Sequence, residues 1–126
     1  MDQAERRSTG ERIYREVTQT PPFPPPDAYV ATTVDTVFGE IWSRPGLTRK
    51  ERRWITLSCV GNAGAPGAME YHMRAALVSG DVSREELVEF ILHFAFYAGW
   101  PLSSALYTTY TKLCAELDAA AGGARR

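Results

Sequence analysis

Apolar residues recur at helical spacing along most of the 126-residue chain. Between residues 28 and 42, for example, Val30, Val34, Phe38 and Ile41 are three or four positions apart, which places them on one face of a helix. The same pattern predicts helices over about residues 9–17, 28–42, 49–62, 67–79, 84–98 and 101–119. No segment alternates convincingly as a strand does, so the sequence predicts an all-α fold of about six helices.

Local signals mark the predicted helix ends. A capping box pairs an N-cap hydroxyl with an acid three residues later, and this pattern occurs at Ser8 with Glu11, Thr48 with Glu51 and Ser83 with Glu86. The helix over 84–98 is apolar nearly all round, which indicates burial on several sides, by its own domain or by a partner subunit.

A proline-rich segment divides the chain near its start. Five prolines between residues 20 and 26 exclude a helix there and favour an extended connector. We therefore expect an N-terminal helix and Pro-rich arm over 1–26, a helical domain over 27–119 and a disordered tail over 120–126. The arm is a candidate for contact with a neighbouring subunit.

The composition argues against nucleic acid and membrane as partners. The net charge is −1 and the charged fraction 23%, so no overall positive field favours nucleic acid. No stretch reaches the roughly 18 apolar residues of a membrane span. Cys59 and Cys114 lack a Cys-x-x-Cys or metal-ligand spacing, which predicts reduced, mostly buried thiols in a cytoplasmic protein.

The two histidines of the chain, His72 and His93, both lie inside apolar helical patterns. Histidine changes its charge near neutral pH, so a pair of them in apolar surroundings is consistent with proton transfer. Buried histidines that only complete a hydrogen-bonded core give the same pattern. The spacing by itself leaves both interpretations open.

Four short segments together resemble the carboxymuconolactone decarboxylase family. They are Phe38-Gly-Glu-Ile-Trp-Ser-Arg-Pro-Gly-Leu47, Arg52 with Ile55-Thr-Leu, His72-Met-Arg-Ala-Ala-Leu, and His93 to Pro101. The resemblance covers about residues 28–110. It implies the AhpD-like helical fold, assembled as a trimer or hexamer.

The residues at its motif argue against the peroxidase branch of that family. Counting back from His72, its two cysteines fall on Ala65 and Ala68, and its glutamate falls on Arg53. Alanine neither attacks a peroxide nor resolves the product. Cys59, among apolar residues in mid-helix, is a poor substitute. The resemblance therefore points to the decarboxylase branch, which works without cofactor or metal.

Decarboxylation of a small carboxylated lactone needs cations for carboxylates, donors for an oxyanion and an acid that delivers a proton. The resemblance implies His72 and His93 as catalytic residues. It implies substrate binding by Arg44, Arg52, Trp42, Tyr97 and Glu70. Structural roles are the alternatives: Arg44 tying down its Pro-Gly turn, Trp42 and Tyr97 in the core, and Glu70 in a surface pair with Arg74.

The expected function is a cofactor-independent decarboxylase or related lyase acting on a small anionic ring, in the catabolism of aromatic compounds. The small, uncharged run over 61–67 departs from the decarboxylase branch and puts the substrate in question. Two alternatives follow. One is a diverged enzyme that isomerises or opens another cyclic acid in natural-product metabolism. The other is a non-catalytic, oligomeric binding module.

Overall fold

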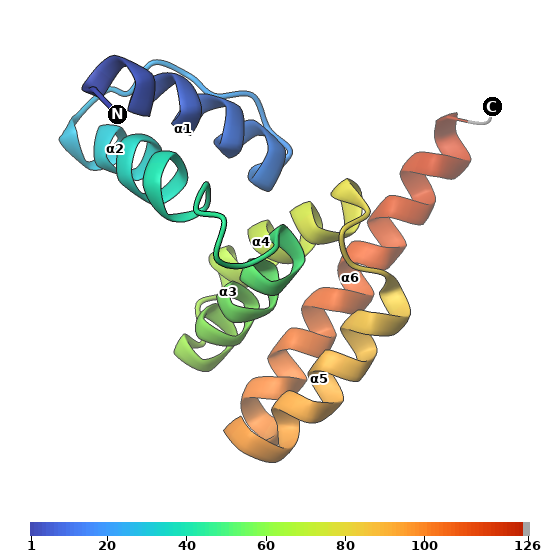
Figure 1. Cartoon of the computed structure of the whole chain (residues 1–126). Coiled ribbons are helices and arrows are strands. Elements are labelled where there is room, and N and C mark those ends of the chain that lie inside the picture. Colours follow the sequence, from blue (N-terminus) through green and yellow to red (C-terminus); the bar gives the residue numbers. More distant parts are fainter. Residues whose placement is uncertain (125–126) are drawn as a thin grey trace. The chain divides into compact units, whose positions relative to one another are not determined.

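The computed structural model describes residues 1–124, and helices make up most of that range (Figure 1). The prediction of an all-α fold is confirmed. The elements are α1 (Gln3–Thr18), α2 (Ala28–Thr32), η1 (Thr33–Ile41), α3 (Arg49–Ala63), α4 (Pro66–Ser79), α5 (Arg84–Ala98) and α6 (Trp100–Ala124). They form two compact units, residues 1–52 and 53–126.

The first unit is built from α1 packed against η1, which continues directly from α2. Its core contains Ile13 and Val17 from α1 with Phe38 and Trp42 from the second helical segment. Gly10 permits this close approach, because a Cβ at that position would lie 2.1 Å from the carbonyl oxygen of Val34. Packing between the two segments therefore depends on a missing side chain.

Two boundaries in this unit differ from the prediction. α1 begins at Gln3 and is capped by a box between Asp2 and Glu5, so the expected start near Ser8 was wrong. The predicted helix over 28–42 does begin after an N-cap at Asp27, but it continues from Thr33 as a π-helix. Apolar spacing over nine residues does not separate a π-turn from an α-turn, since the period differs by less than one residue.

The second unit contains α4, α5, α6 and most of α3. Its core draws on all four helices, with Leu57, Met73, Leu87, Leu106 and Leu113 almost fully buried. Figure 1 shows α5 and α6 lying side by side along the second unit. α3 reaches the same core through Gly61, where a Cβ would lie 2.9 Å from Leu106.

Predicted caps in this part of the chain are confirmed. Ser83 and Glu86 form the capping box that opens α5, and α4 ends at Gly80 in the left-handed conformation. Thr48 and Glu51 bond each other's backbone N–H before α3. α6 runs to Ala124, beyond the expected end near residue 119, and the last two residues of the predicted tail lie outside the described range.

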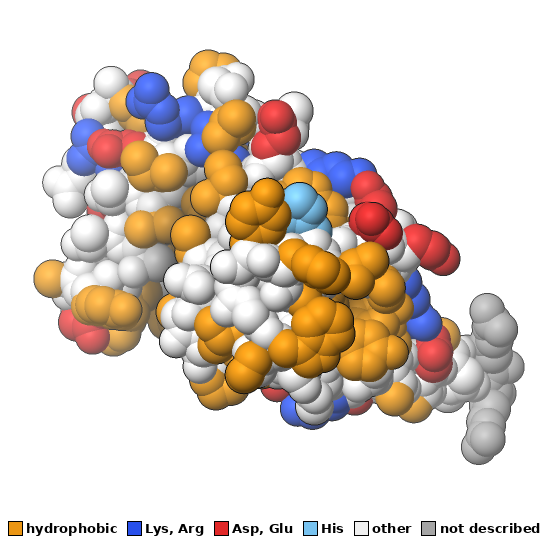
Figure 2. Space-filling view, turned by 90° about the horizontal axis from the view of Figure 1, so that it is seen from below, with side chains coloured by type: hydrophobic (Ala, Val, Ile, Leu, Met, Phe, Trp, Pro, Cys, Tyr) orange, Lys and Arg blue, Asp and Glu red, His pale blue; other side chains and the backbone are white. Residues whose placement is uncertain are grey.

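The apolar helix α5 is covered on one side only. Leu87, Ile91 and Phe94 are buried in the core, whereas Leu92 and Phe96 are exposed. Figure 2 shows hydrophobic side chains gathered on the surface seen from below, with a histidine at their edge. None of the described helices combines the length and apolar character that a membrane span requires.

Candidate functional site

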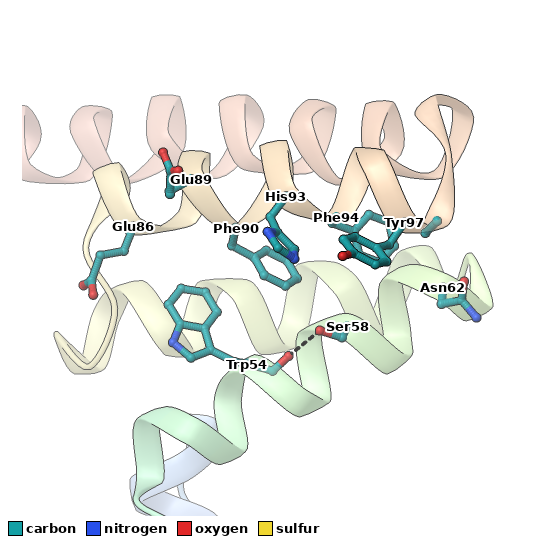
Figure 3. Close-up of a pocket in the computed structure, with 10 residues that line it drawn as sticks. Trp54, Ser58, Asn62, Glu86, Glu89, Phe90, His93, Phe94 and Tyr97 are labelled. Carbon is teal, nitrogen blue, oxygen red and sulfur yellow. Dashed lines mark hydrogen bonds between the residues drawn. The ribbon is translucent and has the colours of Figure 1, made fainter.

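A pocket of about 670 Å³ lies between α3 and α5 in the second unit (Figure 3). A volume of this size is typical of small-molecule sites. The pocket is lined by Trp54, Ser58, Asn62, Glu86, Glu89, Phe90, His93, Phe94, Tyr97 and Ala98. It therefore contains two of the residues predicted for the site, His93 and Tyr97.

The pocket residues come from one stripe on each helix. On α3 they are Trp54, Ser58 and Asn62, each four positions after the last, so they project from one face. On α5 the stripe runs from Glu86 through Phe90 and His93 to Tyr97. The sequence pattern did not reveal the α3 stripe. One signal could have revealed it. Trp54, Ser58 and Asn62 follow a four-residue spacing, but two of the three are polar, whereas a helix face buried in a core would carry apolar residues at these positions.

Aromatic rings form much of the pocket wall. Trp54 and Phe90 stack across from α3 to α5, with ring centroids 5.2 Å apart and an interplanar angle of 25°. Farther along α5, the imidazole of His93 stacks on the ring of Tyr97 at 5.0 Å and 14°. These walls suit a flat, apolar ligand such as a small ring.

His93 and Tyr97 lie on the open side of the pocket. Both are exposed in this chain, Tyr97 at 85%. The His93 ring nitrogens are therefore accessible to a ligand and to water. The Tyr97 hydroxyl is a further hydrogen-bond donor beside it.

The polar groups of the pocket are of two kinds: charged carboxylates and neutral side chains that can donate hydrogen bonds. Glu86 and Glu89 contribute carboxylates, and no lysine or arginine is among the described lining residues. The Ser58 hydroxyl donates to the Trp54 carbonyl oxygen at 2.7 Å, so its proton is already committed. Donors for an oxygen-rich ligand therefore come from His93, Tyr97 and the Asn62 amide.

The other histidine, His72, is half-buried on α4 and does not line this pocket. Burial lowers the pKa of the His72 imidazole, and the positive charge of Arg53 lowers that pKa further. Arg53 is itself only 2% exposed, and its Nε donates to Asp81 Oδ2 at 2.8 Å. A lowered pKa favours a neutral imidazole at neutral pH.

Three of the predicted binding residues belong to the first unit. Trp42 is buried and stacks on Phe38, with ring centroids 6.3 Å apart, so its visible role is in that core. Arg44 is exposed, and Arg52 Nη2 donates to the Arg44 carbonyl oxygen at 3.1 Å. This bond ties the Arg52 side chain on α3 to the backbone of the segment before α3. None of these three residues is among the residues that line the pocket.

Glu70 is engaged with cations on the surface of the second unit. It lies 3.1 Å from Lys112 Nζ and 3.6 Å from Arg74 Nη2. The hydrogen bond from Lys112 lowers the pKa of the Glu70 carboxyl. The suggested surface pair with Arg74 is confirmed, and Glu70 is not among the residues that line the pocket.

The described residues offer few groups for metal or thiol chemistry. No group of three His, Cys, Asp or Glu side chains that could hold a metal ion occurs within residues 1–124. Cys59 is exposed and Cys114 is half-buried, so the expectation of mostly buried thiols was wrong for Cys59. Cys59 follows Ser58 in sequence but does not line the pocket.

Comparison with known proteins identifies the class. The model of the carboxymuconolactone decarboxylase family matches residues 27–109, about two-thirds of the chain. The chain belongs to this family. A 4-carboxymuconolactone decarboxylase from Acinetobacter baylyi is 43% identical over 68 residues, covering 54% of this chain and 50% of the relative.

A second relative is named for a different substrate. The nitrosuccinic acid decarboxylase of Metarhizium robertsii is 33% identical over 91 residues, covering 72% of this chain and 62% of that protein. The chain thus spans between half and two-thirds of the length of these curated relatives. Both are named as decarboxylases of small acids.

Proposed function

We propose that this chain is a cofactor-independent carboxy-lyase acting on a small carboxylated ring, such as a carboxymuconolactone-like lactone. The observation that carries the proposal is the pocket itself. It sets an imidazole, His93, against aromatic walls in a member of a family whose two matched relatives are named decarboxylases. An acid at the edge of an apolar pocket is what decarboxylation with carbon protonation needs.

In the proposed reaction, the bond between the ring carbon and the carboxylate breaks and carbon dioxide leaves. The electron pair moves into the conjugated carbonyl, which gives an enolate. Protonated His93 then donates its proton to carbon and becomes neutral. Tyr97, stacked on His93, donates a hydrogen bond to an oxygen of the substrate. Water on the open side of the pocket returns a proton to His93.

The two histidines receive different roles in this proposal. A histidine that delivers a proton in this way has to start in its protonated, positively charged form. The lowered pKa of His72 and its position outside the lining residues both argue against that role. We therefore assign the proton to His93 and a structural role to His72. Binding of carboxylate by Arg44 and Arg52 stays a prediction.

The identity of the acid is a separate question with two candidates. The Acinetobacter relative favours a lactone dicarboxylate, whereas the Metarhizium relative is named for an open-chain nitro acid. The stacked aromatic walls favour a ring.

The test is carbon dioxide release from carboxymuconolactone, from nitrosuccinate and from a panel of related ring acids. His93→Gln should lower turnover by about 10²-fold or more. His72→Gln should leave most of the turnover intact. Both variants should keep the helical circular dichroism of the parent. If no acid in the panel releases carbon dioxide, the carboxy-lyase assignment fails and a binding module becomes the better hypothesis.

We further propose that the chain forms a homo-oligomer, a trimer or hexamer, in the cytoplasm. Support comes from the outer face of α5 and α6. Leu92, Phe96, Trp100 and Tyr107 are all exposed there, and residues 90–111 contain no Asp, Glu, Lys or Arg. A second copy of the chain is the occupant that an uncharged, apolar face of this kind fits best.

A further inference from the structure

The rings of Trp54 and Phe90 form a bridge across the pocket between α3 and α5. Trp54 comes from α3 and Phe90 from α5, and both side chains line the pocket. Their ring centroids are 5.2 Å apart with an interplanar angle of 25°, which is typical of aromatic rings in direct contact. No ligand ring fits between them, so the Trp54–Phe90 bridge limits the space that a ligand can use.

The bridge is held in place from the core side of the pocket. Phe90 packs against Phe94 with ring centroids 5.9 Å apart, and Phe94 is itself buried. Trp54 and Phe90 are both half-buried and packed against the hydrophobic core of the second unit. Side chains that interlock with a close-packed core move little without disturbing that core. The Trp54–Phe90 bridge is therefore a fixed wall of the pocket.

The residues around His93 lie on one side of this bridge. Figure 3 shows Glu86 toward one side of Trp54 and Phe90, and Tyr97 and Asn62 toward the other. The part of the pocket beyond the bridge, the His93 compartment, is lined by Ser58, Asn62, His93, Phe94, Tyr97 and Ala98. From Phe90 to Ala98 the helix rises by roughly 12 Å, at about 1.5 Å per residue. The bridge thus sets one end of a compartment of limited length.

We propose that Trp54 is a specificity-determining residue, whose indole, stacked on Phe90, sets the upper size limit of the acid that binds beside His93. A single ring occupies the His93 compartment alone. A fused second ring needs the space that the indole fills, and forcing extra atoms into filled space is unfavourable. This inference rests on the proposed function in taking the ligand to be a small ring acid that binds at His93.

The test compares two carboxylates that differ by one fused ring, benzoate and 2-naphthoate. Their binding is followed through the His93 ring signals in NMR spectra, so it is measured apart from turnover. Trp54→Leu removes the indole but keeps an apolar side chain against the core. This substitution should raise the affinity for 2-naphthoate relative to benzoate by about tenfold or more, because the second ring then has space.

Trp100→Leu is the matched control, since it is the same chemical change outside the pocket. Trp100 is exposed at the start of α6 and does not line the pocket, so this variant should keep the wild-type affinity ratio. Trp54→Phe retains a ring against Phe90 and should raise the ratio by a smaller factor. Circular dichroism checks the fold of each variant, and Trp54→Phe decides the test if Trp54→Leu loses its helical spectrum.

The outcomes separate this inference from the proposed function. If the ratio rises for Trp54→Leu alone but no acid of the panel releases carbon dioxide, the Trp54 assignment stands and the carboxy-lyase proposal fails. If carbon dioxide is released but both Trp54 variants keep the wild-type ratio, the Trp54 assignment is overturned. An equal rise for Trp100→Leu would also overturn it, as would a lack of any His93 shift with either carboxylate in every variant.

Discussion

At the scale of single residues, His72 and His93 look alike in sequence but have different surroundings. His93 is exposed beside Tyr97 on the open side of an aromatic pocket, and His72 is half-buried near the charge of Arg53. The exposure of each histidine depends on which face of its helix is covered by another helix in the folded chain. Both share an apolar local sequence, so the sequence pattern does not separate them.

The lowered pKa of His72 predicts how stability depends on pH. The folded-state pKa lies below the ordinary value of 6.5, so the folded chain binds fewer protons than the unfolded chain in that range. The free energy of unfolding should therefore be highest above about pH 6.5 and should fall as pH decreases through the lower, folded-state pKa. His72→Gln should remove this part of the dependence.

Urea unfolding at several pH values between about 7.5 and 5 measures this effect, with His93→Gln as the matched control. The slope of stability against pH should be shallower for His72→Gln than for the parent. Equal slopes for His72→Gln and the parent would show that burial of His72 has no energetic consequence.

At the scale of elements, packing in the first unit depends on one glycine contact. Gly10 on α1 meets the carbonyl oxygen of Val34, and a Cβ there would lie at 2.1 Å, closer than any real contact. The sequence predicted a helix in this region but began it too late, because Asp2 with Glu5 forms the same capping pattern as Ser8 with Glu11. When two equivalent capping patterns lie close together, only the tertiary packing of the helix decides at which of them the helix begins.

Gly10→Ala should therefore force α1 away from η1 and destabilise the first unit by about 1–3 kcal/mol. Gly46→Ala is the control in the same unit, since a Cβ at Gly46 would meet nothing within 4 Å and its backbone is unstrained. Thermal unfolding followed by circular dichroism compares the two. A Gly10→Ala variant as stable as Gly46→Ala would contradict the close approach of the two segments.

At the scale of the whole molecule, the uncharged face of α5 and α6 is the feature that a single chain does not explain. Phe96 is 77% exposed and Trp100 63% exposed, next to a smaller groove lined in part by Leu92 and Tyr107. Large apolar side chains exposed side by side in this way are more typical of an interface than of a free surface. The sequence already indicated that α5 is buried on several sides. In the single chain only one side of α5 is buried.

This face predicts an assembly larger than the 14.0 kDa chain. Phe96→Glu should shift the mass toward the monomer, because a carboxylate buried in an apolar interface is costly. Val78→Glu, on α4 and also exposed, is the control. Size-exclusion chromatography with light scattering gives both masses. A parent chain that runs as a monomer would contradict the prediction.

The sequence by itself determined the all-α class, most helix ends, the family resemblance and the loss of the redox cysteines at Ala65 and Ala68. These depend on local spacing, on capping side chains and on residue identity, all of which are present in the chain as written. Only the tertiary structure decided which side chains share a pocket. It joined His93 and Tyr97 to Trp54, Ser58 and Asn62 on another helix, because side chains from separate helices converge only after the core between those helices has packed.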